Sequence, residues 1–134
     1  MTPLRDLADL PASTEFYIFG AGRGGEIMLR LLRRRPDIKV AGFVDNQKTG
    51  TLASLPILDF KGLLAAGSQA GQVIIASMYV YEIAAQLRRA GVKEFYNGHP
   101  LIAEEIERLR KRKRLLIFGG YALVAAAVAS TFLI

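Results

Sequence analysis

Short apolar runs alternate along the chain with segments in which apolar residues recur every three or four positions. The runs have the length of buried strands, and they fall at 15–20, 38–45, 55–58, 72–77 and 92–97. The periodic segments between them have the spacing of amphipathic helices. Strands that alternate with helices predict an α/β fold, in which about five parallel strands in the order 3-2-1-4-5 carry helices on both faces.

The periodic segments predict three connecting helices and a fourth after the last strand. We expect them at 24–36, 60–66 and 78–91, and from Pro100 onward. The first ends in three arginines, which suit the carboxyl end of a helix dipole. Asp59 stands directly before the second, where its side chain can act as an N-cap.

The segment 115–134 contains no charged side chain. As a helix it would be roughly 30 Å long, which is the thickness of the hydrocarbon layer of a bilayer. A buried core helix is the alternative, but core helices are usually shorter and carry a polar face. We therefore expect a C-terminal transmembrane helix.

Charge agrees with this expectation. Six of the 18 basic residues lie between Arg108 and Arg114, and subtracting them leaves 12 basic against 12 acidic residues. The net charge of +6 is therefore a local feature. Nucleic-acid binding would need a basic face spread over the fold together with base-reading residues. The sequence shows neither, so we expect no nucleic-acid partner. A basic cluster before an apolar span is typical of the cytoplasmic flank of a transmembrane helix, and it attracts anionic lipid.

The position of this span predicts a single-pass, tail-anchored membrane protein whose remaining part is cytoplasmic. A truncated form of a longer membrane protein would show the same pattern. Small residues four positions apart, Ala122, Ala126 and Ser130, allow membrane helices to approach closely, so a homo- or hetero-oligomer through this helix is a further expectation. The chain has no cysteine, which removes disulfides and thiol catalysis.

A glycine-rich stretch, GAGRGG, follows the first strand and opens the first helix. Gly20, Gly22 and Gly25 have the spacing G-x-G-x-x-G, and Asp45 closes the next strand. Gly20 would form the tight turn, Gly22 would admit a phosphate to the backbone, and Gly25 would let the helix pack against the strand. The Asp45 carboxylate would accept hydrogen bonds from the ribose hydroxyls, which favours NAD over NADP. The alternative is that the glycines serve backbone geometry alone.

Three further residues complete the candidate binding site. Arg23 can clamp a phosphate or face solvent as an ordinary loop residue. Asn46 can reach a ribose or base, or hold the turn. Ser77 ends the fourth strand, at the crevice where such sheets bind ligands.

Other residues near that edge have plainer interpretations. Met78 and Tyr79 can flank a base or sugar, although helix start and packing is favoured. His99, the only histidine, is more typical of a cap or surface residue than of a proton-transfer group. We assign no catalytic residue and no metal site.

The segments YIFGAGRGGEIMLRLL, KVAGFVDNQKTG, LPIL and QVIIAS resemble small Rossmann-like domains found beside glycan-building enzymes. One such domain precedes the sugar O-acyltransferases that acetylate UDP-amino sugars. Another precedes the catalytic part of membrane-bound nucleotide-sugar 4,6-dehydratases. The resemblance covers 14–98 and implies nucleotide or nucleotide-sugar binding, with chemistry often done by another domain. This sequence has neither a hexapeptide-repeat acyltransferase part nor a Tyr-x-x-x-Lys pair at Tyr79 or Tyr81.

The predicted organisation has four parts: an N-terminal segment at 1–13, a Rossmann-like nucleotide-binding domain at 14–99, an amphipathic and basic juxtamembrane helix at 100–114, and a transmembrane helix at 115–134. The leading hypothesis is a membrane-anchored module that binds NAD or a UDP-sugar, is non-catalytic alone, and works in glycan or envelope biosynthesis. The alternatives are a small NAD-dependent oxidoreductase or epimerase, and a ligand-free adaptor that acts through its tail.

Overall fold

The computed structural model describes residues 1–67 and 72–132, and their side chains as far as Gly119. Among these residues, seven strands form one sheet: β1 Thr2–Pro3, β2 Glu15–Phe19, β3 Lys39–Val44, β4 Gly50–Leu52, β5 Leu55–Leu58, β6 Val73–Ile75 and β7 Tyr96–Asn97. Their order is β1-β7-β6-β2-β3-β5-β4, and β4 alone pairs antiparallel, with β5. The five inner strands, β5-β3-β2-β6-β7, confirm the predicted 3-2-1-4-5 order. The sheet is therefore Rossmann-like.

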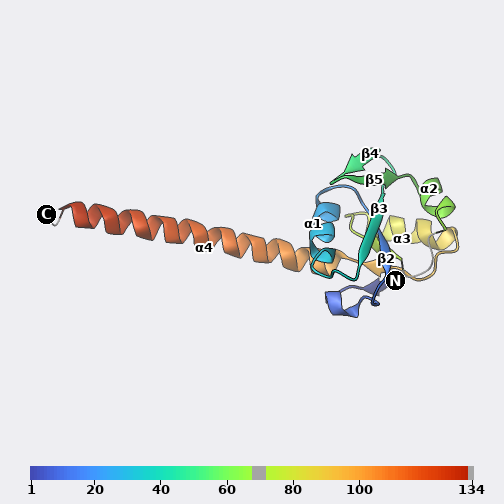
Figure 1. Ribbon diagram of the computed structural model, residues 1–134, viewed down its shortest axis with the longest axis horizontal. Coiled ribbons are helices and arrows are strands. Elements are labelled where there is room, and N and C mark those ends of the chain that lie inside the picture. Colours follow the sequence, from blue (N-terminus) through green and yellow to red (C-terminus); the bar gives the residue numbers. More distant parts are fainter. Residues whose placement is uncertain (68–71, 133–134) are drawn as a thin grey trace. The chain divides into compact units, whose positions relative to one another are not determined.

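In the described ranges, four α-helices and one short 3-10 helix accompany the sheet: α1 Arg23–Leu32, α2 Phe60–Ala65, α3 Val80–Arg89, α4 His99–Phe132 and η1 Leu7–Asp9. Figure 1 shows α1 on one side of the sheet and α2 and α3 on the other. The expected N-cap of α2 is confirmed, because Asp59 Oδ1 accepts a hydrogen bond from the Gly62 N–H at 2.7 Å.

The predicted count of about five strands omitted both edges of the sheet. Strand β1 is only two residues long, too short to show a period, yet the Thr2 and Leu4 N–H groups bond to carbonyls beside and within β7. Strand β4 precedes a two-residue hairpin turn at Ala53 and Ser54, both with positive φ. Neither alanine nor serine is common in such a turn, so the sequence has no clear hairpin signal here.

The first helix ends at Leu32, four residues before the predicted boundary of Pro36, and Arg35 lies in the turn that follows it. Its guanidinium donates to the carbonyl oxygens of Leu7 and Leu10 at 2.8 and 2.7 Å, and it pairs with Asp37 at 2.6 Å. The bonds from Arg35, followed by one from the Ser13 N–H, lower the pKa of Asp37 to about 2. Arg35 thus fastens the N-terminal segment to the turn between α1 and β3.

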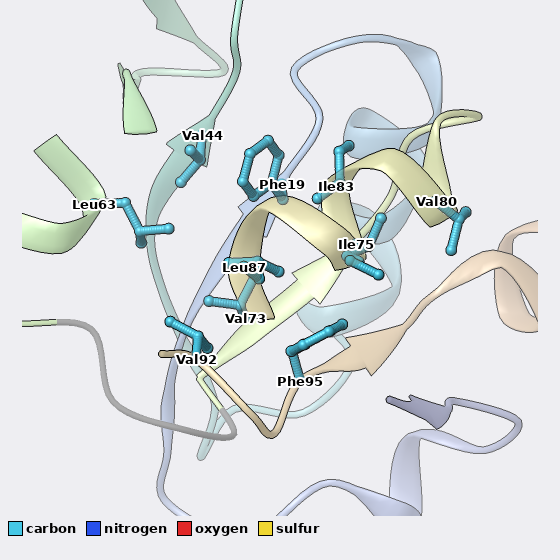
Figure 2. Close-up of a cluster of buried hydrophobic side chains, with 11 residues drawn as sticks. Phe19, Val44, Leu63, Val73, Ile75, Val80, Ile83, Leu87, Val92 and Phe95 are labelled. Atoms are coloured by element: carbon cyan, nitrogen blue, oxygen red, sulfur yellow. The ribbon is translucent and has the colours of Figure 1, made fainter. Parts of the chain in front are cut away.

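The core lies on both faces of the sheet because successive strand residues point to opposite sides. On one face, side chains from β2, β3 and β6 meet those of α2, α3 and the segment before β7 (Figure 2). Phe19, Val44 and Ile75 lie there, at the carboxyl ends of their strands. On the α1 face, the fully buried Phe43 and Met28 belong to β3 and α1. The residues at the carboxyl ends of these strands are therefore held in place by buried side chains.

The chain divides into two compact units, 1–102 and 103–134. In the second unit the basic run is helical and exposed as part of α4. Within the part of the chain that the structure describes, no helix has the length and apolarity needed to cross a membrane. The predicted transmembrane helix at 115–134, with its small residues Ala122, Ala126 and Ser130, lies for the most part beyond Gly119 and so outside the described side chains.

Candidate functional site

The glycine loop connects the carboxyl end of β2 to the amino end of α1. Gly20 has φ +126°, which L side chains rarely adopt, and its N–H donates to the Val44 carbonyl at 2.8 Å. Gly22 is the N-cap of α1 and supplies no side chain to bond the N–H groups of the first turn. Those groups and the helix dipole favour a negative charge at this end of α1.

The loop glycines fall into two steric classes. A Cβ at Gly25 would overlap the Gly20 carbonyl oxygen and press on the Phe43 ring, and one at Gly24 would overlap the Ala76 carbonyl oxygen. Gly22 differs, because a Cβ there would meet only Lys48 Nζ, at 3.7 Å. Gly24 and Gly25 are thus required by close packing of α1 on the sheet, whereas Gly22 leaves backbone accessible. The G-x-G-x-x-G pattern does not distinguish Gly24, so its role could not be predicted from the sequence.

Asp45 is half-buried beside the loop and binds backbone. Its Oδ2 accepts from the Ala21 N–H at 3.0 Å, and its Oδ1 accepts from the Gln47 and Lys48 N–H groups at 2.9 and 2.8 Å. Burial raises the pKa of this carboxyl, but the three backbone bonds and the Lys48 charge together lower it. A carboxylate has about four acceptor positions, so three are already used. Asp45 therefore holds the glycine loop to the turn after β3, with little capacity left for a ribose.

Lys48 lies at this site although it was not among the residues predicted from the sequence. The turn held by Asp45 places its ammonium group over the loop, where Nζ donates to the Ala21 carbonyl at 3.4 Å. The side chain is exposed and stands next to Gly22. A signal was present in DNQK, because an aspartate often accepts from the N–H groups two and three residues later and so turns the chain back. Lys48 brings a positive charge to the amino end of α1.

Most of the predicted site residues lie together. Arg23 is the exposed first residue of α1. Ser77 lies beside Gly20, with its Cβ 3.2 Å from the place of a Cβ there, and its Oγ accepts from the Tyr79 N–H at 3.2 Å. Asn46 follows Asp45, and its side chain forms a reciprocated amide pair with Gln86 of α3, at 2.9 and 3.0 Å.

The remaining candidates lie on the surface. Met78 and Tyr79 are 88% and 68% exposed, so the interpretation that they pack is wrong, although Tyr79 does occupy the N-cap position at the start of α3. His99 is exposed at the start of α4, and its N–H donates to Asn97 Oδ1. Among the described residues no group of three or more His, Cys, Asp or Glu side chains can hold a metal ion.

Neither a protein-family model nor a curated protein matches the sequence. A crystal structure of an engineered D-amino acid dehydrogenase bound to NADP+ is similar, with 18% identity and a TM-score of 0.46. The match covers 60% of this chain and 25% of that one, so the chain spans about a quarter of that dehydrogenase. The resemblance to domains beside sugar O-acyltransferases and nucleotide-sugar dehydratases stays a prediction.

Proposed function

We propose that the unit 1–102 binds a nucleotide through its pyrophosphate, with the phosphates at the start of α1. The observation that supports this most is the contrast within the loop. At Gly25 the space that a Cβ would need is already occupied by packed atoms, whereas Gly22 leaves the backbone open under the ammonium group of Lys48. An open helix amino end beside a cation suits a phosphate. NAD and UDP-sugars both carry a pyrophosphate, so either fits this chemistry, and we propose a binding module rather than an enzyme.

The test is binding of NADH, ADP and a UDP-sugar to the full chain in detergent micelles, by calorimetry and thermal shift. We expect Lys48→Met to weaken nucleotide binding roughly tenfold. A hydrogen bond to a charged group contributes about 1.5–3 kcal/mol, and exposure to solvent reduces this contribution. Lys61→Met, which removes an exposed lysine on α2, is the matched control and should bind like the wild type. No stabilisation by any nucleotide, or equal affinities for the two variants, would contradict the proposal.

We further propose that the second unit attaches the protein to an anionic membrane, with the nucleotide-binding unit on the cytoplasmic side. Two features of α4 support this. The basic run is exposed, and the next four residues, Leu115, Leu116, Ile117 and Phe118, are 49–74% exposed. Consecutive exposed apolar residues are unfavourable in water and typical of an interaction surface. The cations beside them suit the negative surface potential of the cytoplasmic leaflet.

Co-sedimentation of the full chain with lipid vesicles tests this attachment. We expect binding to vesicles with and without anionic phosphatidylserine, and tighter binding to the anionic ones. Replacing Arg112 and Lys113 with Gln should weaken anionic-vesicle binding by roughly 30-fold, at about 1 kcal/mol per basic residue. The control replaces Lys61 and Lys93, which are exposed in the first unit, and removes the same charge. Absence of binding to both vesicles, or equal loss in the control, would rule the attachment out.

A further inference from the structure

A shallow depression lies beside the glycine loop, on the α3 side of β3. Asn46 lines it from the turn after β3, and α3 contributes Tyr81, Glu82, Ala85, Gln86 and Arg89. Their spacing places the α3 residues along one side of the helix. The residue before Asn46 is Asp45, whose carboxylate binds the Ala21 N–H of the loop. The depression thus begins one residue after the aspartate that holds the glycine loop, and this loop carries the place proposed for the phosphates.

The lining of this depression includes the amide pair of Asn46 and Gln86. Each amide has two N–H donors and two acceptor lone pairs, and the reciprocated pair uses one of each. In a planar pair of this kind, the second N–H of one amide lies on the same side as the second lone pair of its partner. Asn46 Nδ2 and Gln86 Oε1 are 2.9 Å apart. The pair therefore presents a donor next to an acceptor, and each amide fixes the orientation of the other.

We propose that this depression binds the adenine base of the nucleotide and that the amide pair reads its edge. The inference rests on the proposed function, which supplies the pyrophosphate anchor. Adenine carries a donor, the N6 amino group, directly beside an acceptor, N7, and side-chain amides pair with this edge. The corresponding edge of guanine carries two acceptors, O6 and N7, and does not match.

The rim of the depression supplies surfaces for stacking. Tyr81 is 81% exposed, and Arg89 follows two helical turns later on the same side of α3. Aromatic rings and guanidinium planes are the usual stacking partners of an unpaired base. Exposure of a tyrosine beside fixed hydrogen-bonding groups therefore suits a flat, polar-edged ring.

The test compares ADP with ADP dimethylated at N6, which cannot donate from that nitrogen, by titration calorimetry on the full chain in detergent micelles. We expect the wild type to bind ADP roughly tenfold more tightly than the dimethylated form. Gln86→Met should reduce that ratio to within about twofold. Gln47→Met is the matched control, since Gln47 is exposed next to Asn46 but lies outside the pair, and it should keep the tenfold ratio.

The outcomes separate this inference from the proposed function. Equal binding of the two ADP forms by the wild type, or a tenfold ratio that survives Gln86→Met, overturns the adenine site. Tighter binding of UDP than of ADP also overturns it. In these cases a loss of affinity in Lys48→Met would still support the phosphate site. Absence of binding by every nucleotide overturns both.

Discussion

Gly25→Ala is expected to lower the free energy of unfolding by about 3 kcal/mol, which is the upper part of the range for an overpacked core. The added methyl group would overlap the Gly20 carbonyl oxygen and press on the Phe43 ring. A backbone oxygen cannot rotate away as a side chain does, so α1 would have to move off the sheet. The effect is measured by urea unfolding followed through tyrosine fluorescence, since Tyr17, Tyr79, Tyr81 and Tyr96 all belong to the first unit.

Gly22→Ala is the matched control for this prediction. The same methyl group would lie 3.7 Å from Lys48 Nζ, an ordinary contact, and the backbone at Gly22 has negative φ. Loss of a favoured N-cap residue should cost no more than about 1 kcal/mol. Nucleotide affinity should show the opposite order, because the added methyl group covers the open backbone. Similar losses of stability in the two variants would contradict the division of the loop into packed and open glycines.

The parts of the fold that follow from periodicity could be predicted from the sequence. The strand at 15–20 and the glycine loop together fixed the start of α1, and the order of the inner strands followed from right-handed crossovers. The edges could not be predicted, because β1 is defined by the N–H groups of Thr2 and Leu4 bonding to residues more than 90 positions away. Nothing local in two residues encodes such a pairing.

The candidate site shows the same division between local and long-range determinants. The spacing of Gly20, Gly22 and Gly25 identified the loop, but spacing alone cannot tell which glycines are packed. The pair between Asn46 and Gln86 joins residues 40 positions apart and depends on where α3 crosses the sheet. The exposure of Tyr81 likewise depends on which side of α3 the core occupies. These features need the assembled fold.

Asp45 is the residue for which the sequence and the structure give different roles, and Asp45→Asn separates them. As a ribose ligand, Asp45 would contribute to nucleotide affinity and little to stability. As the acceptor of three backbone N–H groups, it stabilises the fold. We expect Asp45→Asn to lower the free energy of unfolding by about 2 kcal/mol at pH 7, because an amide turns a donor toward backbone donors. Unchanged stability with lost nucleotide binding would restore the ribose role.

The pH dependence of this loss gives an independent check. The folded pKa of Asp45 lies below its usual value, so the carboxylate contributes fully above the unfolded pKa of about 3.9 and loses its contribution as the pH falls through the lower folded value. The stability difference between the wild type and Asp45→Asn should therefore be constant from pH 7 to about 5 and shrink in acid. Asp37, with its pKa of about 2, adds a second acid-sensitive contribution that this variant keeps. Asp37→Asn should reduce that second contribution while leaving the Asp45 contacts intact, because its partners are Arg35 and the Ser13 N–H rather than the glycine loop.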